Sequence, residues 1–214
     1  MAKRNFKPGT MVNPVPAVMV SCGEIDGIKN IITIAWTGII NSDPPMTYVS
    51  VRKERYSHQL IKDSGEFVIN LVTKDLTFAT DFCGVRSGRD LDKFAEQKLT
   101  PAPCELVSCP AIKESPVNIE CKVIEIKEFP SHDMFIGEIV NVQVNEELID
   151  EKDRIALEKA GLVAYCHGEY FGLNQRPIGR FGYSVMKAKT KKRIAAEKRS
   201  AQLGKKAQRR NRKK

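Results

Sequence analysis

The chain has 214 residues, of which 42% are hydrophobic, and its formal net charge is +9. This length can form one large domain or two small ones with a substantial core. The charge is uneven, because residues 186–214 carry 14 Lys and Arg against one acid (+13), whereas residues 1–185 carry 21 basic and 25 acidic side chains (−4). The basic balance therefore belongs to an appendage and does not indicate that the domain itself binds nucleic acid.

We predict one domain over residues 1–185 and a tail over residues 186–214. The tail has too few apolar side chains to build a core, so it is expected to be disordered or nascently helical. Such a run can contact nucleic acid or an acidic membrane surface through salt-sensitive electrostatics, or act only as a solubilising extension.

The six cysteines contain no CxxC pair and have no histidine at metal-ligand spacing, so no metal site is predicted. No apolar run approaches the roughly 20 residues that span a bilayer. The N-terminus lacks the apolar core of a signal peptide. These features predict a soluble, cytoplasmic protein with reduced thiols and no transmembrane segment.

The first strands are predicted from two apolar runs, residues 15–22 and 30–36, joined by a turn that contains an Asp-Gly pair. A polar turn at residues 41–45 separates the second run from residues 46–52, an alternating run rich in β-branched and aromatic side chains. The chain is therefore expected to begin as antiparallel β-structure.

Short helices and further strands follow. Ser57 is predicted to cap a helix that ends near Gly65, and residues 66–71 then form a strand. Residues 74–82 predict a second helix, and a Ser-Gly-Arg loop at residues 87–89 precedes a short amphipathic helix.

The second half is mostly β-structure. Residues 99–116 are Pro-rich and irregular, and two long alternating strands follow at residues 117–128 and 134–144. His132 opens the second of these strands, and residues 162–173 predict one further strand. Six to eight strands with short helices between them favour a mainly antiparallel barrel over a parallel α/β sheet.

The common nucleotide and hydrolase signatures are missing from the chain. It has no GxGxxG after a strand, no GxxxxGK[ST], no HExxH and no GxSxG. What remains is a set of small, hydroxyl and basic residues at strand ends. Such a set suits a phosphate-bearing cofactor whose flat ring meets backbone amides and whose phosphate meets Arg, Lys and hydroxyl groups.

Six segments can be compared with known families: NIITIAWTGIINSDPPM at 30–46, RYSH at 55–58, EFVINL at 66–71, CGxxSGRDxDKF at 83–94, HDMFIGEIV at 132–140 and YFGL at 170–173. Together they resemble the flavin reductase-like family of FMN-binding split barrels, most closely its flavoredoxin-type members. Their order and spacing cover residues 14–183. The resemblance implies an antiparallel Greek-key split β-barrel with short flanking helices.

The resemblance also implies a set of site residues. At the isoalloxazine edge it places Ala35, Trp36, Thr37, Asn41, Ser42 and Asp43. At the ribityl phosphate it places Ser50, Val51, Arg52 and Ser57, and near the flavin it places Ser87, Gly88 and Lys93. His132 is the catalytic candidate, because family members use a histidine there near the nicotinamide or the flavin ring.

Each of these residues also has a purely structural interpretation. Trp36 could be a core aromatic, Arg52 a member of a solvated charge cluster, and Lys93 a surface charge at a helix start. His132 could be a turn histidine that faces water. Tyr170 could stack on a cofactor or pack in the barrel.

The function implied is that of an FMN-dependent oxidoreductase, with FMN rather than FAD as cofactor. NADH or NADPH would pass a hydride to flavin N5, and the electrons would go on to free flavin, a metal complex, oxygen or a protein partner. The family forms homodimers with the flavin near the interface, so a homodimer is expected.

Three alternatives stay open at this point. A flavoredoxin-type electron carrier without NAD(P)H turnover, or a flavin-storage protein, would need nearly the same site. A nucleic-acid-binding β-barrel with a basic tail is a third possibility, but the net acidic body counts against it.

Overall fold

The computed structural model describes residues 1–174, 176–179, 181–190 and 192–193. The chain divides into two compact units, Met1–Gln175 and Arg176–Lys214, so the division lies before the expected boundary at residue 186. Most of the tail expected to be disordered, residues 194–214, lies outside the described residues. No helix in the described part of the chain is both long and apolar enough to cross a bilayer.

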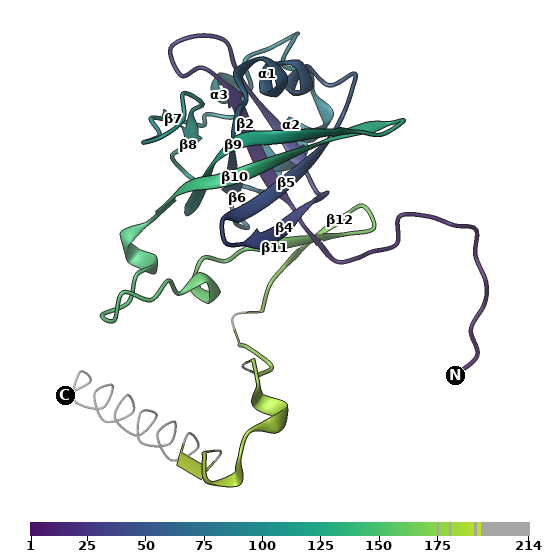
Figure 1. Ribbon diagram of the computed structural model, residues 1–214, viewed down its shortest axis with the longest axis vertical. Helices are drawn as coiled ribbons and strands as arrows, with labels where there is room; N and C mark the ends of the chain where they lie inside the picture. Colours follow the sequence, from purple (N-terminus) through teal and green to yellow (C-terminus); the bar gives the residue numbers. More distant parts are fainter. Residues whose placement is uncertain (175, 180, 191, 194–214) are drawn as a thin grey trace, which may run out of the picture. The chain divides into compact units, whose positions relative to one another are not determined.

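Seven strands form the main sheet of the first unit, and every pair of neighbours is antiparallel (Figure 1). In sheet order they are β3 (Lys29–Ile34), β2 (Val18–Gly23), β6 (Glu66–Leu71), β9 (Val117–Glu128), β10 (His132–Val144), β5 (Pro45–Arg52) and β4 (Thr37–Ser42). The expected mainly antiparallel split β-barrel is confirmed. The order of the strands in the sheet differs from their order along the chain, because β5 pairs with β10 and β2 pairs with β6.

The apolar run of residues 30–36 does not continue as one strand to the polar turn. β3 ends at Ile34, and β4 begins at Thr37. These two strands stand at opposite ends of the sheet order. The Trp36 carbonyl accepts a hydrogen bond from the Ser50 amide at 3.0 Å, so this crossing brings the end of β3 against β5.

Two smaller sheets complete the β-structure. One contains β1 (Val15–Pro16), β11 (Val163–Cys166) and β12 (Glu169–Gly172), and the other contains β7 (Pro101–Ala102) and β8 (Ala111–Ile112). The prediction of a single strand over residues 162–173 is wrong. The chain reverses at His167 and Gly168, which both have positive φ (54° and 92°), and the run becomes the β11–β12 hairpin.

The helices of the first unit are short. They are α1 (Tyr56–Ser64), α2 (Thr77–Val85) and α3 (Lys93–Glu96), with single 3₁₀ turns η1 (Glu146–Leu148) and η2 (Leu157–Lys159). The described residues of the second unit include the 3₁₀ turn η3 (Tyr183–Val185). α1 ends at Gly65, as expected, because this glycine adopts the left-handed conformation (φ 67°) that stops a helix.

The prediction that Ser57 caps α1 is wrong. The N-cap residue is Arg55, which makes no side-chain capping bond, and Ser57 lies inside the first turn. Its hydroxyl oxygen instead accepts a 2.8 Å hydrogen bond from the Asn30 side chain of β3. Ser57 is buried, so this bond joins the start of α1 to the sheet.

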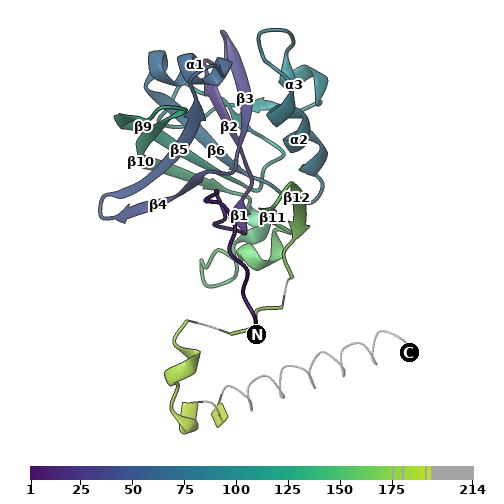
Figure 2. The ribbon, with the colours of Figure 1, turned by 90° about the vertical axis from the view of Figure 1, so that its right-hand side faces the viewer.

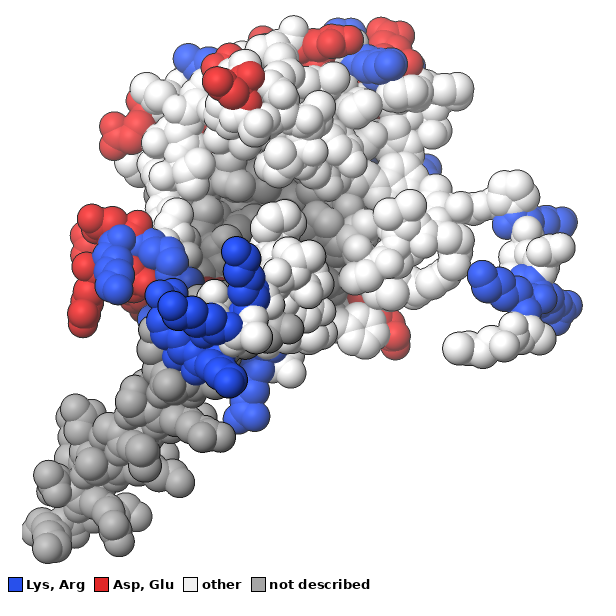
Figure 3. Space-filling model, turned by 60° about the horizontal axis from the view of Figure 1, so that its bottom comes forward, with Lys and Arg blue, Asp and Glu red and all other residues white. Residues whose placement is uncertain are grey.

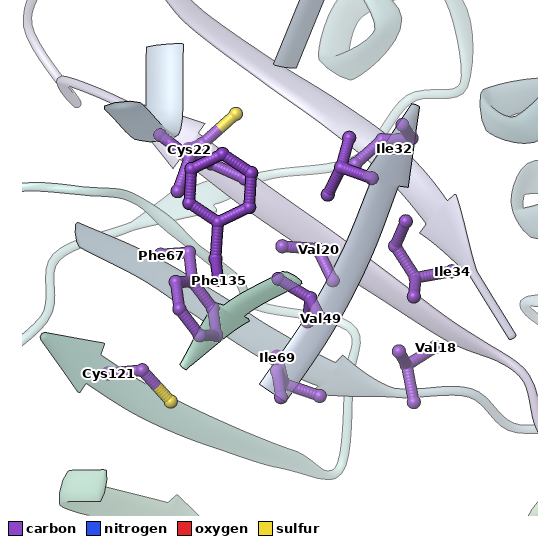
Figure 4. Close-up of a cluster of buried hydrophobic side chains, with 12 residues drawn as sticks. Val18, Val20, Cys22, Ile32, Ile34, Val49, Phe67, Ile69, Cys121 and Phe135 are labelled. Carbon is purple, nitrogen blue, oxygen red and sulfur yellow. The ribbon is translucent and has the colours of Figure 1, made fainter. Parts of the chain in front are cut away.

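The barrel core lies between the faces of β2, β3, β5, β6 and β10 (Figure 4). Phe67 and Phe135 are its largest fully buried side chains, and each contributes about 1.5–3 kcal/mol of burial free energy. Gly137 is needed beside them, because an added Cβ would lie 2.9 Å from the Phe67 ring. This packed core holds β3, β5 and β10 rigidly where their ends form the candidate site.

A buried carboxylate fixes the irregular segment at residues 99–116. Glu120 on β9 is fully buried and accepts hydrogen bonds from the backbone amides of Glu105 (3.1 Å) and Leu106 (2.7 Å). The side chains of Asn141 and Gln143 on β10 also donate to it, at 2.8 and 3.2 Å. These bonds replace the water that the carboxylate loses on burial.

Candidate functional site

Two neighbouring cavities lie along β3. The first, which we call the aromatic cavity, has a volume of about 410 Å³. It is lined by Ala17, Ile32, Thr33, Ile34, Ala35, Trp36, Ser50, Arg52, Arg55, Asp81, Gly84, Val85, His132, Tyr165 and Tyr170. Most of these residues come from β3 and the residues directly after it, from α2 and the β11–β12 hairpin, and from β5 and β10. Figure 2 shows α2 and β12 on one side of β3 and β5 and β10 on the other.

The second, which we call the cationic cavity, has a volume of about 320 Å³. It is lined by Asn30, Ile32, Glu54, Arg55, Tyr56, Ser57, Cys83, Arg86, Ser87, Gly88, Arg89 and Lys93. Four of these side chains are cationic, and one, Glu54, is acidic. Ile32 and Arg55 line both cavities, so the two spaces adjoin.

Close packing between β3 and α2 shapes the boundary of the aromatic cavity. The Thr33 hydroxyl donates to the Thr80 carbonyl. A Cβ added to Gly84 would lie 3.2 Å from the Thr33 Cβ, so this helix position favours glycine. The helix therefore lies close against the strand that forms the cavity floor.

Trp36 and His132 pack against each other at the lining of the aromatic cavity. Their ring centroids are 4.6 Å apart with an interplanar angle of 36°. Trp36 is 42% exposed, which rules out the interpretation that it is a core aromatic. His132 lines the same space and pairs with Arg52 across the β10–β5 ladder.

His132 is held in its neutral form at neutral pH. Partial burial lowers the pKa of its imidazole below the usual value, and the nearby Arg52 guanidinium lowers it further. The Ser131 hydroxyl lies 2.9 Å from His132 Nδ1 and fixes one side of the ring. A neutral imidazole at this cavity can either donate or accept a hydrogen bond.

The far wall of the aromatic cavity carries a carboxylate. The Tyr170 hydroxyl donates to Asp81 at 3.3 Å, and the Tyr165 ring packs edge-on against Tyr170 at 5.3 Å. Burial and the neighbouring Asp81 raise the pKa of Tyr170 to about 12, so the phenol keeps its proton. Tyr170 therefore both packs in the wall and borders the cavity, so the two interpretations of this residue are compatible.

The structure divides the group of residues expected at a phosphate. Ser50 and Arg52 line the aromatic cavity, whereas Ser57 lines the cationic cavity. Arg52 is exposed and lies 3.5 Å from Glu54. The Val51 side chain is fully buried in the barrel core, so only the backbone of this residue is available to a ligand.

Four residues expected at the isoalloxazine edge do not line either cavity of the described chain. Asn41, Ser42 and Asp43 are exposed at the tip of the β4–β5 hairpin, where Asn41 Nδ2 donates to the Pro44 carbonyl at 2.9 Å. The Thr37 hydroxyl donates to the Tyr48 carbonyl at 2.5 Å. Their role at a flavin ring stays a prediction. Ala35 and Trp36, from the same group, do line the aromatic cavity.

Lys93 is a buried cation and not the surface charge of the alternative interpretation. Its side chain is 4% exposed, and its Nζ donates to the carbonyls of Ile31 (2.7 Å) and Cys83 (2.8 Å). Burial lowers the pKa of this ammonium below its usual value. Both acceptors are neutral, so these two bonds leave its positive charge uncompensated beside the cavity.

The Ser87-Gly88 turn lies against β3, as the position of Gly88 shows. A Cβ at Gly88 would lie 2.1 Å from Asn30 Oδ1, so only glycine fits beside this asparagine. The same asparagine donates to Ser57. Asn30 therefore contacts both Ser57 and the Ser87-Gly88 turn, and all three expected residues line the cationic cavity.

Sequence reasoning missed several cations of this cavity. Arg55, Arg86 and Arg89 were not assigned to a site, although Arg55 precedes a helix and Arg89 belongs to the Ser-Gly-Arg loop. The Arg89 guanidinium lies 5.2 Å from the centre of the Tyr56 ring and donates to the Glu54 carbonyl at 3.1 Å. The clustering of Lys and Arg near residues 52–55 and 86–93 was the available signal.

The arrangement suits a ligand with a flat ring and an anionic group. Aromatic side chains and strand backbone surround the first space, and the uncompensated Lys93 charge and three arginines surround the second. Within the part of the chain that the structure describes, no group of three or more His, Cys, Asp or Glu side chains could hold a metal ion.

Known proteins are similar to this chain in fold and in sequence. The family model for the flavin reductase like domain matches residues 11–174. The flavoredoxin of Desulfovibrio vulgaris (Miyazaki F) is 32% identical, with a TM-score of 0.79, and the match covers 86% of this chain and 100% of that protein. The flavoredoxin from Methanosarcina acetivorans is 26% identical, with a TM-score of 0.77, and the match covers 87% of this chain and 100% of that protein. An uncharacterized protein of Aquifex aeolicus is 30% identical over 168 residues, 75% of this chain and 85% of that protein. The chain therefore belongs to the flavin reductase-like family of split-barrel proteins.

Proposed function

We propose that this protein is an FMN-binding oxidoreductase that moves electrons from NAD(P)H, or from a redox partner, through bound FMN to an acceptor. The observation that carries the proposal is the pair of adjoining cavities, one aromatic and one cationic, that share Ile32 and Arg55. A ring and a single phosphate on a short ribityl chain match two spaces of these types. FMN is preferred to FAD because one cluster of cations is accounted for by one phosphate.

The residues present fit the cofactor. Lys93, Arg55 and the first turn of α1 would hold the phosphate, and the backbone of Ala35 and Trp36 would border the ring. When bound, FMN supplies the capacity to accept a hydride and to release electrons singly or in pairs. The protein's part is to bind and orient the cofactor and to keep water from the ring.

His132 is proposed to contact the nicotinamide or the flavin ring. Its neutral imidazole lies 4.6 Å from the Trp36 ring, at the side of the aromatic cavity formed by β5 and β10. A neutral hydrogen-bonding group there can orient a polar substrate group without adding a charge to the cavity.

The first test is whether the purified protein is yellow and takes up FMN. We expect a flavin absorbance spectrum, or stoichiometric uptake of added FMN by the apoprotein. A colourless protein that also fails to bind FMN would overturn the proposal. Anaerobic mixing of the FMN-loaded protein with NADH or NADPH then asks whether either nucleotide bleaches the bound flavin.

A flavoredoxin-type carrier without NAD(P)H turnover is the second candidate, and the two flavoredoxins similar to this chain favour it. It predicts that neither nucleotide bleaches the bound flavin, although a chemical reductant does. Rapid bleaching by one nucleotide would instead support the reductase.

A homodimer is also proposed. Ile39 and Ile40 on the edge strand β4 are 72% and 47% exposed, at a register shift in the β4–β5 ladder, and Trp36 nearby is 42% exposed. A second copy that covers this strand would bury all three and close the aromatic cavity. Gel filtration with light scattering should give twice the chain mass, and a monomer would contradict the proposal.

The nucleic-acid-binding barrel is less well supported. On the face of the molecule that Figure 3 shows, much of the surface is uncharged, and acidic and basic side chains lie close together near its upper edge and again at its left. A barrel that reads single strands needs a basic groove with exposed aromatics. A role of the tail in contacting nucleic acid or acidic surfaces remains a proposal, as does the cytoplasmic location, which the six unpaired cysteines favour.

A further inference from the structure

A buried histidine and carboxylate join α1 to β10. His58 Nε2 lies 2.8 Å from Asp133 Oδ2, and the two side chains are only 9% and 6% exposed. The His58 ring also packs edge-on against Phe135 at 5.1 Å. Because both groups are polar and buried, each depends on the other for a hydrogen-bond partner.

Lys53 completes this cluster from the surface. Its Nζ lies 3.2 Å from Asp133 Oδ1 and 3.9 Å from Glu128, and its side chain is 44% exposed. Burial alone would raise the pKa of Asp133, but the hydrogen bond with His58 and the charge of the nearby Lys53 ammonium outweigh it and lower the pKa. The carboxylate is therefore ionised at neutral pH and holds both partners.

Each end of the cluster lies next to the proposed FMN site. His58 is in the first turn of α1, directly after Arg55, Tyr56 and Ser57, which line the cationic cavity. Asp133 directly follows His132, which lines the aromatic cavity. Neither His58 nor Asp133 lines the aromatic or the cationic cavity, so their effect on a ligand bound there must be indirect.

The first turn of α1 has no side-chain cap, so buried side-chain bonds to the sheet hold it in place: that of Ser57 with Asn30 and that of His58 with Asp133. Arg55 at the N-cap position makes no capping hydrogen bond. The amide groups at a helix start carry partial positive charge and bind anions well only when they point at the anion. A fixed anchor one residue beyond Ser57 sets that direction.

We propose that the His58–Asp133 pair is a positioning device that aims the first turn of α1 at the cofactor phosphate. This inference rests on the proposed function, in that the anion is the phosphate of FMN. Its specific consequence is that the pair sets the discrimination between FMN and riboflavin, which has the same ring and no phosphate.

The test compares the affinities of FMN and riboflavin for the apoprotein in three variants: His58→Leu, Asp133→Asn and Lys53→Met. We expect the FMN dissociation constant to rise about tenfold in the first two, and less in Lys53→Met, while that of riboflavin changes by less than about twofold. A merely structural role would weaken both ligands together. Lys53→Met keeps the test decisive if a buried substitution prevents folding, because Lys53 is partly exposed.

The matched control is Gln59→Ala on the exposed face of the same helix, which removes the Gln59–Asp63 hydrogen bond of 2.6 Å. It should leave the FMN-to-riboflavin affinity ratio unchanged. The inference is overturned if folded variants bind FMN normally, if FMN and riboflavin weaken equally, or if the control changes the ratio as much. Failure of the unaltered protein to bind FMN would instead overturn the proposed function.

Discussion

The two cavities are built by different means. The aromatic cavity is walled mainly by strands, and its shape follows from backbone crossing and close packing at Trp36 and Gly84. The cationic cavity is built from helix ends and a loop, and a buried ammonium at Lys93 dominates its chemistry. The contrast shows that the proposed ring site depends on shape, whereas the proposed phosphate site depends on charge.

The largest effect is expected from Lys93→Met. The variant removes the charge and leaves the carbonyls of Ile31 and Cys83 without their donor, which costs about 1–3 kcal/mol for each buried group. We expect a clear fall in melting temperature and at least a hundredfold loss of FMN affinity, measured by fluorescence titration. Riboflavin should be affected far less. Normal FMN affinity in Lys93→Met would show that the charge is not part of the site.

A pair of glycine substitutions separates the cavities. Gly88→Ala places a Cβ 2.1 Å from Asn30 Oδ1 and should displace the side chain that donates to Ser57, so FMN affinity should fall more than riboflavin affinity. Gly84→Ala places a Cβ 3.2 Å from Thr33 and should weaken both ligands similarly. Each substitution should cost about 1–3 kcal/mol of stability. If the two variants changed the FMN and riboflavin affinities in the same way, the division into two functional cavities would be contradicted.

His132→Ala should act on turnover more than on binding. If His132 orients the substrate, flavin reduction by NAD(P)H should slow about tenfold to a hundredfold, with FMN affinity within about twofold. Arg52→Ala is expected to weaken FMN binding first. Stopped-flow bleaching and equilibrium titration measure the two effects, and the reverse pattern would show that the roles are exchanged.

His132 also makes the stability of the folded protein depend on pH. Because the folded-state pKa of His132 lies below its unfolded value, the unfolded chain binds the proton first as the pH falls. The contribution of His132 to stability is therefore present above about pH 6.5 and decreases through the interval down to the lowered pKa. In a thermal-unfolding series, His132→Gln should reduce this slope, and an unchanged slope would contradict the assignment.

The smallest effect is expected from Asp81→Asn at the far wall of the aromatic cavity. Asp81 accepts from the neutral Tyr170 hydroxyl, so that bond leaves its negative charge uncompensated. The measurement is the rate at which photoreduced, FMN-loaded protein reduces a small charged electron acceptor. In the variant this rate should fall about threefold with a trivalent cationic acceptor and rise about threefold with a trivalent anionic one. High salt should abolish the difference. Asp26→Asn, in the exposed β2–β3 turn, is the matched control.

Much of the fold could be predicted because strand patterns are local. The strand patterns located β6 and β9 at their observed bounds and β5 and β10 to within two residues. The errors came where the pattern was ambiguous. Residues 162–173 were predicted as one strand because both arms of the hairpin are of strand type. Ser57 was predicted as a cap because a serine near a helix start has the same local signature at the N-cap position and two positions after it.

The sequence by itself determined the family segments, the mainly antiparallel barrel and several residues of the site, since periodicity and motif spacing are properties of neighbouring residues. The tertiary structure alone decided which of them share a cavity. Lys93 reaches Ile31 across 62 positions, and His58 reaches Asp133 across 75. Such contacts depend on strand order and crossing, which a local pattern does not contain. The same physical reason explains why the phosphate residues foreseen together, Ser50, Arg52 and Ser57, are divided between two cavities.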